Sequence, residues 1–253
     1  MNKKINPDTA EILGAFIGDG WIEKSKCSIY ITGDRIEDRE YYDQFLAPLF
    51  SKVFCEVQPK EFLYWKVYGI GCHKKQIIQK CKDLGFQSGR KSLIAKIPTL
   101  FIDSNNPEVK KAVLRGIFDA DGSIWFDKSR AKTSVAWKKK FHYIPIVEIT
   151  SCSENLMEQI RTLILGLGIE SKLRLKSKAG RRSNRNRHDS FSVKIQKIDH
   201  VKKWFQIIGS SNPRHQTRYA VWEMFGFLPP GTNINQRKMM LKGNLDQKSF
   251  YEK

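Results

Sequence analysis

The sequence predicts an α+β fold made of two pseudo-symmetric αββαββα subdomains, residues 1–100 and 101–253, each with a curved antiparallel sheet that forms half of a saddle. Three observations predict this fold. A helix-forming segment that ends in Asp-Gly occurs twice, at residues 12–20 and 114–122. Equivalent positions of the two copies lie 102 residues apart. After each copy, the apolar residues change from a helical spacing to the alternating spacing of strands.

The repeated helices have recognisable ends. Each copy follows an Asn-Pro pair, at residues 6–7 and 106–107. Asn is a favoured N-cap and Pro suits the first turn, so both helices are expected to begin there. Both are expected to end at their Asp-Gly pair, with Gly20 and Gly122 in the left-handed conformation that often terminates a helix.

The rest of the first half alternates strands with a helix. Ile29 and Ile31 alternate with polar neighbours and predict one strand. A helical spacing follows over residues 37–50. Apolar residues then alternate again over residues 63–68 and predict a further strand.

The second half repeats this order. A strand is expected around residues 147–149, and a helix over residues 153–167 with Ser153 as its N-cap. Two more strands are expected around residues 172–176 and 191–196. The second half therefore has the same sequence of elements as the first.

The composition points to a polyanionic partner. The 253 residues carry 45 Lys and Arg against 26 Asp and Glu, a formal net charge of +19. Nucleic acid is the usual partner of such a chain, and an anionic membrane surface is the alternative. No basic amphipathic helix with a continuous apolar face stands out, and the longest apolar run is far shorter than the roughly 20 residues that span a bilayer. We therefore expect a nucleic-acid partner and no membrane.

The cysteines indicate a reducing compartment. The five cysteines are odd in number, widely spaced and without a C-x-x-C pair. No apolar signal segment follows the initial methionine. These features predict reduced thiols in an intracellular protein, in the cytoplasm or nucleoid, or in an organelle if the source is eukaryotic.

The repeated helices are expected to pack closely against each other. Small residues recur four positions apart on both: Gly14 with Gly18, and Gly116 with Ala120. Glycine inside a helix costs roughly 0.5–1 kcal/mol relative to alanine, so its use in both copies needs a reason. Close contact of the two helix backbones supplies that reason. It would bring Asp19 and Asp121 face to face at the helix ends.

Two apposed carboxylates repel each other, and a divalent cation relieves that repulsion. The carbonyl groups of Gly18 and Ala120, at the same helix ends, add partial negative charge. Oxygen ligands of this kind suit Mg²⁺, with Mn²⁺ or Ca²⁺ able to replace it for binding, and a cation beside a phosphodiester supports its hydrolysis. A single Asp-Gly pair would be interpreted as a turn. Two copies in the same helical context favour a metal site at Asp19 and Asp121.

These residues give the chain a resemblance to the single-chain, two-motif LAGLIDADG homing endonucleases, over nearly its whole length. The resemblance implies a monomeric, divalent-metal-dependent enzyme of intron homing. Such an enzyme cuts both strands of a long, asymmetric DNA site and leaves short 3′ overhangs. It also implies that Asp19 and Asp121 bind the metals, and that a lysine near the end of each repeat lies close to the reacting water. Lys91 is the candidate in the first half. Arg214 stands at the matching place in the second.

Alternate residues of the predicted strands are expected to face double-stranded DNA, because a β-ribbon fits the major groove. The candidates in the first half are Ser28, Tyr30, Tyr64, Lys66 and Tyr68. Those in the second half are Lys172, Arg174, Lys176, Ser192, Lys194 and Gln196. The basic run continues through Arg181 and Arg182, which could equally form a solvated loop.

Two other functions remain open on the same fold. One is a DNA-binding regulator, or an RNA-splicing maturase, with reduced catalytic activity. Retention of both acids argues against it, because a protein that only binds gains nothing from two apposed charges. The other is an RNA endonuclease of the tRNA-intron type. That enzyme would need a His-Tyr-Lys acid–base set, and no such set occurs at a suitable spacing.

Overall fold

The computed structural model describes residues 5–23, 27–89, 91–128, 141–182 and 185–252. Of residues 181, 182 and 185–187, only the main chain is described. Within these residues, no helix is long and apolar enough to cross a membrane. All five cysteines are free thiols.

The first half contains one four-stranded antiparallel sheet in the order β1-β2-β4-β3. Its elements are α1 (Pro7–Asp19), β1 (Gly20–Glu23), β2 (Ser28–Gly33), α2 (Arg39–Tyr41), a π-helical turn (Tyr42–Leu46), α3 (Ala47–Val53), β3 (Lys60–Phe62), β4 (Val67–Cys72), α4 (Lys75–Asp83) and α5 (Thr99–Ile102). The predicted helix over residues 37–50 is confirmed, as α2, the π turn and α3 in one run. The expected boundary after residue 100 falls inside α5.

The second half contains a sheet of the same topology, in the order β5-β6-β10-β7. Its elements are α6 (Pro107–Asp121), β5 (Gly122–Asp127), β6 (Ile144–Ser151), α7 (Glu154–Gly166), β7 (Lys172–Ser177), β8 (Gly180–Arg182), β9 (Arg185–Arg187), β10 (Ser190–Ile195) and α8 (Ile198–Ile207). Strands β8 and β9 pair with each other as a separate hairpin. The chain then adds α9 (Pro213–Phe225), α10 (Ile234–Leu241) and a 3₁₀ turn (Gln247–Tyr251). The predicted α+β fold of two repeated subdomains is confirmed.

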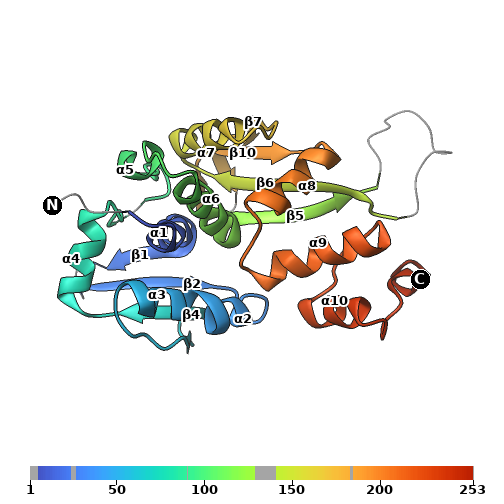
Figure 1. Ribbon diagram of the computed structural model, residues 1–253, viewed down its shortest axis with the longest axis horizontal. Coiled ribbons are helices and arrows are strands. Elements are labelled where there is room, and N and C mark those ends of the chain that lie inside the picture. The colour runs from blue at the N-terminus through green and yellow to red at the C-terminus, as the bar shows by residue number, and fades with distance from the viewer. Residues whose placement is uncertain (1–4, 24–26, 90, 129–140, 183–184, 253) are drawn as a thin grey trace.

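Helices α1 and α6 lie side by side between the two sheets, and α9 and α10 extend from the second subdomain towards the α2 end of the first (Figure 1). Most residues of both central helices are buried. Ile12 and Leu13 of α1, and Leu114 of α6, have no exposed surface. One continuous apolar core includes residues of both subdomains. The repeated helices are therefore the centre of the molecule.

The predicted N-caps of these helices are confirmed. The side chain of Asn6 accepts a hydrogen bond from the amide of Thr9 at 2.8 Å, and that of Asn106 accepts one from the amide of Glu108 at 3.0 Å. Ser153 caps α7 in the same way. Asn and Ser satisfy amide groups that have no partner within the helix.

The expected left-handed ends at Gly20 and Gly122 are wrong. Gly20 has φ −92° and ψ 159°, and Gly122 has φ −86° and ψ 169°. Both are extended because each helix passes directly into a strand. Glycine is required there for space: a Cβ at Gly20 would lie 2.8 Å from Cα of Phe16, and one at Gly122 would lie 2.8 Å from Cα of Phe118.

The expected strand over residues 63–68 is also wrong for most of its length. Phe62 pairs with Val67 across the β3–β4 hairpin, so residues 63–66 form its turn, with Lys66 at φ 56°. The real strand, β4, contains Gly69 and Gly71, which have no side chains to show an alternating pattern. The alternation that the sequence shows therefore belongs to the turn.

Candidate metal centre and nucleic-acid interface

The two central helices touch main chain to main chain, as their small residues predict. A Cβ at Gly14 would lie 2.8 Å from the amide nitrogen of Ile117 and 3.0 Å from Cα of Gly116. A Cβ at Gly116 would lie 2.8 Å from the amide nitrogen of Ala15. Nothing larger than hydrogen fits at these crossings without moving a backbone.

The same contact brings the helix ends together. A Cβ at Gly18 would lie 3.4 Å from the carboxyl carbon of Asp121. Asp19 is the last residue of α1, and Asp121 is the last residue of α6. The structure therefore places the two predicted acids at one end of the helix pair.

The environment of these acids disfavours their negative charge. Burial, and after it the neighbouring carboxylates of Asp121 and Asp38, raise the pKa of Asp19 to about 8, although Arg214 and Lys91 act in the opposite direction. Burial also raises the pKa of Asp121, while Lys91 and Arg214 lower it. Two neighbouring acids of raised pKa need added positive charge before both can ionise.

Lys91 and Arg214 cap the two helices at equivalent positions. The ammonium group of Lys91 donates to the carbonyl oxygens of Phe16, Ile17 (2.6 Å) and Gly18 (3.1 Å). Burial lowers the pKa of Lys91 to about 8, although Asp121 and Asp19 favour its charged form.

Arg214 occupies the corresponding place on α6. Its Nη2 donates to the carbonyl oxygens of Asp119 at 3.3 Å and Ala120 at 3.4 Å. Those residues are 102 positions after Ile17 and Gly18, so the two basic side chains bind equivalent carbonyl groups of the repeated helices. This places positive charge at the partially negative end of each helix.

A cavity of about 300 Å³ opens beside the acids. Gly18, Lys91 and Asp121 line it on the helix side, and Thr150, Ser151 and Ser190 line it on the side of the second sheet. The described residues contain no group of three or more His, Cys, Asp or Glu side chains placed to hold a metal ion. Any cation here would therefore take further ligands from carbonyl groups, water or a bound phosphate.

Sequence reasoning missed a buried polar group that supports this centre. Asp119, the first acid of the Asp-Ala-Asp-Gly segment, accepts hydrogen bonds from the hydroxyl of Ser210 and, at 2.8 Å, from the amide of Ser211. Burial raises the pKa of Asp119 to about 7, and these two bonds lower it. Glu11 of α1 accepts from the Ser211 hydroxyl at 2.7 Å. Both acids thus fix the turn that leads to Arg214. The available signal was an acid among the apolar residues of each repeated segment, Glu11 before Ile12 and Asp119 after Phe118.

The second sheet presents most of its predicted basic residues on one face. Strand β10 pairs with β6 on one side and β7 on the other. This pairing places Lys194 opposite Glu148 and Lys172, and Ser192 opposite Thr150 and Arg174. The intervening residues, such as Val193 and Ile195, lie in the core. Lys176 binds Thr150 and Glu148 on the same face, and Gln196 follows the last residue of β10. Arg181 and Arg182 lie in β8, with side chains outside the described residues.

One acid on this basic face was not predicted. Glu148 is 5% exposed and binds Lys176 at 3.1 Å, Lys194 at 3.3 Å and the indole nitrogen of Trp125 at 3.0 Å. It therefore ties together side chains from three strands. It lies on β6, outside the basic run that drew attention in the sequence.

The first sheet differs from expectation. Tyr30 lies on the outer face but is only 6% exposed, because it stacks on Trp21 at 4.9 Å and packs edge-on against Trp65 at 5.3 Å. Ser28 is buried and hydrogen-bonded to His73 at 2.7 Å. An aromatic cluster therefore covers residues that were expected to face DNA directly.

The other candidates of the first half lie at or after the hairpin turn. Tyr64 is 93% exposed at the turn, and Lys66 ends it. Tyr68 was expected on the outer face and is not there: its hydroxyl donates to Asp43 at 2.5 Å, and the guanidinium of Arg39 lies 4.3 Å from its ring centre. The turn shifts the alternation, so that Tyr68 faces the helices.

Comparison with known proteins agrees with this geometry. Residues 108–209 match the family model of the LAGLIDADG-like domain. The chain has a two-repeat LAGLIDADG fold. The homing endonuclease I-DmoI, solved with DNA and Mn, superposes with a TM-score of 0.52 at 17% identity, over 80% of this chain and 96% of that one. The K262A mutant of I-SmaMI superposes with a TM-score of 0.51 at 12% identity, over 95% of this chain and 93% of that one.

A curated relative of this chain is the replication factor C small subunit of Methanocaldococcus jannaschii. It is 26% identical over 210 residues, which are 83% of this chain. The chain spans about 10% of that protein's length. The likeness therefore concerns one segment of a much larger chain.

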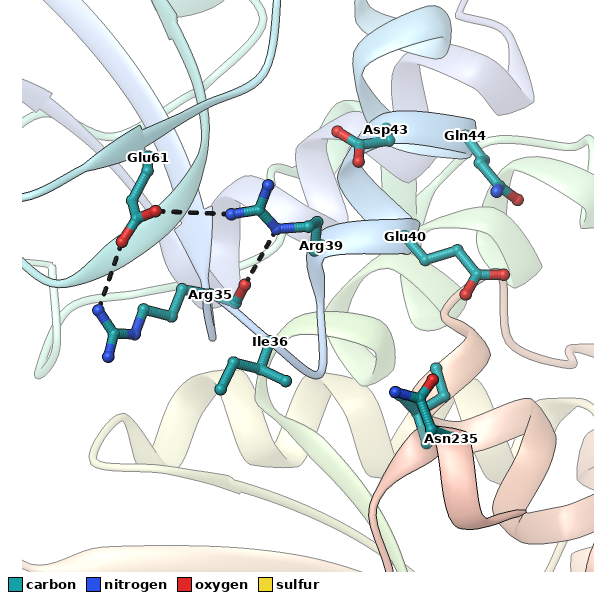
Figure 2. Close-up of a pocket in the computed structure, with 9 residues that line it drawn as sticks. Arg35, Ile36, Arg39, Glu40, Asp43, Gln44, Glu61 and Asn235 are labelled. Atoms are coloured by element: carbon teal, nitrogen blue, oxygen red, sulfur yellow. Dashed lines mark hydrogen bonds and ion pairs between the residues drawn. The ribbon is translucent and has the colours of Figure 1, made fainter. Parts of the chain in front are cut away.

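A second hollow in the described part of the chain lies away from the two acids. It has a volume of about 630 Å³ and is lined by the turn after β2, by α2 and by the start of α10, as Figure 2 shows. Its charges are already paired: Glu61 binds Arg35 at 3.4 Å and Arg39 at 3.5 Å (Figure 2). Its other acids, Glu40 and Asp43, bind Lys238 and the Tyr68 hydroxyl, so the charged side chains that line this hollow already have partners among the described residues.

The raised pKa of Asp19 should make the metal-free protein less stable as the pH rises from 5 to 8. The pKa of Asp19 is about 8 in the folded protein, against an ordinary value of 3.8. Between these values the folded protein holds a proton that the unfolded chain has released, so a rise in pH favours unfolding. Lys91 does not oppose this trend, because it stays protonated in both states below its folded pKa of about 8.

Denaturant unfolding in EDTA at several pH values measures this effect in the parent and in Asp19→Asn. The variant should gain stability over the parent progressively from pH 5 to pH 8. Adding Mg²⁺ at pH 8 should stabilise the parent more than the variant. A difference that stays constant with pH would show that Asp19 is ionised throughout.

Proposed function

We propose that this chain is a monomeric, site-specific DNA endonuclease that hydrolyses phosphodiester bonds with divalent metal, preferably Mg²⁺. It would cut both strands of a long, asymmetric site and leave short 3′ overhangs, as an enzyme of intron homing. One observation carries the proposal: two acids of raised pKa lie at the ends of paired helices, between two sheets, with one basic side chain at each helix end.

The donor set fits a hard divalent cation. Asp19 and Asp121 offer carboxylate oxygens, and Gly18 and Ala120 offer carbonyl oxygens at the same helix ends. Oxygen-only donors with few protein ligands suit Mg²⁺, and also Mn²⁺ or Ca²⁺. I-DmoI has been solved with DNA and Ca or Mn, and its G20S variant with DNA in the presence of Mg, which supports this choice. When bound, the cation would lower the pKa of an attacking water and neutralise charge on the leaving oxygen.

The chain's own residues would supply the remaining functions. The ammonium group of Lys91 and the guanidinium of Arg214 lie where they would neutralise charge that develops on a scissile phosphate. The cavity beside Asp121 would admit the phosphate. Diverged sheets, one basic and one aromatic, would require a different base sequence in each half-site.

The test is cleavage of a plasmid that carries the predicted target site. This site is made by joining the two DNA sequences that flank the reading frame, because an inserted reading frame splits the site that its enzyme cuts. Purified protein with Mg²⁺ should linearise this plasmid and leave an unrelated plasmid intact. EDTA should abolish cleavage. Tight binding of intron RNA without cleavage of any joined site would instead support a maturase, and binding of DNA without cleavage would support a regulator.

The basic face of the second sheet should dominate the salt dependence of DNA binding. Each phosphate neutralised contributes about −0.9 to the slope of log affinity against log salt concentration. Arg174→Gln should therefore reduce the steepness of this slope by about 1. Lys82→Gln, on α4 behind the first sheet, is the matched control and should leave the slope unchanged. If Arg174→Gln and the parent show the same slope of log affinity against log salt concentration, Arg174 does not contact a phosphate.

A further inference from the structure

The two basic side chains of the proposed site are held in different ways. All hydrogen bonds of the Lys91 ammonium group among the described residues go to main-chain carbonyl groups of α1, and the ammonium lies 4.8 Å from the ring centre of Phe16. No carboxylate in the described part of the chain forms an ion pair with Lys91. Arg214, by contrast, binds the carboxylate of Asp38, with Nη1 3.1 Å from Oδ2.

Asp38 belongs to the other subdomain and is itself firmly held. Its side chain is 5% exposed. Oδ2 also accepts from the amide of Asp34 at 2.8 Å, and Oδ1 accepts from the side-chain amide of Asn212 at 2.8 Å. Asn212 is fully buried and donates to the carbonyl of Asp119 at 3.2 Å. The Asp38 carboxylate therefore links the turn after β2 to the start of α9.

This link fixes the direction of the guanidinium group. The group is planar, so binding Nη1 to Asp38 also orients Nη2. Nη2 then faces the carbonyl oxygens of Asp119 and Ala120, next to Asp121. Without Asp38, the charge of Arg214 would remain, but its long side chain would lose the contact that orients it.

We propose that Asp38 is a positioning residue that holds Arg214 for cleavage of one DNA strand only. This rests on the proposed endonuclease function. Lys91 and Arg214 cap different helices of a pseudo-two-fold pair, and the two strands of a duplex are related by the same kind of axis. Each strand would therefore meet one of the two basic side chains. Asp38 touches Arg214, so its influence falls on the strand that Arg214 serves.

Other contacts secure the turn that carries Asp38. Glu37 binds the buried Arg237 of α10 at 2.7 Å, and Glu40 binds Lys238. On the outer side, Glu61 holds Arg35 (Figure 2). These ion pairs do not involve Asp38. A loss of its charge therefore leaves the turn attached on both sides.

The experiment follows each strand of a doubly end-labelled target duplex separately in single-turnover cleavage. Asp38→Asn should slow one strand by roughly 10–100-fold, the usual effect of losing a partner that orients a reactive group, and should leave the other strand within about 2-fold. Nicked DNA should accumulate. Arg214→Met should slow the same strand, and Lys91→Met the opposite one. In the Arg214→Met background, Asp38→Asn should have no further effect on that strand.

Glu61→Gln is the matched control, because it removes an acid that binds two arginines near the same turn without touching Arg214. It should cut both strands at the parent's rate. Equal slowing of both strands by Asp38→Asn, no slowing of either, or an additive effect in the double variant would each overturn the proposal. If Asp38→Asn fails to fold, Arg214→Lys is tested in its place. Lysine keeps the positive charge but lacks the planar guanidinium group, so this variant must slow only the strand that Arg214→Met slows. A parent that cuts neither strand would refute the endonuclease function itself.

Discussion

Asp121→Asn is expected to abolish double-strand cleavage while the protein still binds its DNA site. Asn has the shape of Asp but lacks the charge that holds a divalent cation, so the rate should fall by more than about 100-fold, beyond the usual effect of changes outside the metal ligands. Asp19→Asn should have an effect of similar size. Cleavage in Mg²⁺ and gel-shift binding in Ca²⁺ measure the two properties separately.

The control for these variants is Asp103→Asn. Asp103 follows the last residue of α5 and is exposed, so it is an acid at a helix end with no partner in the proposed site. It should cut at the parent's rate. The metal assignment would be wrong if Asp19→Asn and Asp121→Asn both cut as fast as the parent.

Gly116→Ala is expected to destabilise the protein by about 1–3 kcal/mol, the usual range for overpacking a close-packed core. The added Cβ would lie 2.8 Å from the amide nitrogen of Ala15 and 3.0 Å from Cα of Gly14. Both are backbone atoms of a buried helix and have no rotamer that relieves the clash. Separation of α1 from α6 would also move Asp121 away from Asp19. The temperature of thermal unfolding and the rate of DNA cleavage should therefore both be lower than those of the parent.

Gly166→Ala is the matched control for this substitution. Gly166 is the last residue of α7, and a Cβ there would meet nothing within 4 Å. Alanine is the better helix former, so this variant should be as stable as the parent or more stable, by up to about 1 kcal/mol. Similar unfolding temperatures for Gly116→Ala and Gly166→Ala would contradict the close contact of the two helices.

Features that depend on residues near one another in the chain were predictable. Asn6 and Asn106 cap their helices because a cap forms within one turn of its own residue. The duplicated segment predicted the paired helices, because small residues at equivalent positions of two helices allow their backbones to come into close contact. Asp19 and Asp121 followed from that packing without any knowledge of the sheets.

Features that depend on a turn in the backbone were harder to predict. Tyr68 appeared to share a face with Tyr30, but the turn over residues 63–66 shifts the alternation between them. Strand β4 contains Gly69 and Gly71, which have no side chains, so its sequence shows no alternation of apolar and polar residues. Periodicity shows which face a residue occupies only while the strand is unbroken.

The sequence by itself determined the two subdomains, the glycine contact of their central helices, the paired acids and the basic charge, because each follows from a local spacing or from a repeat. Only the tertiary structure decided which partner each buried charge receives. Asp38 and Arg214 lie 176 positions apart, and Glu37 and Arg237 lie 200 apart. Such pairs form where folded elements happen to meet, and no spacing within either segment indicates the other. The burial of Tyr30 beneath an aromatic cluster was decided in the same way, by strands that meet only in the folded sheet.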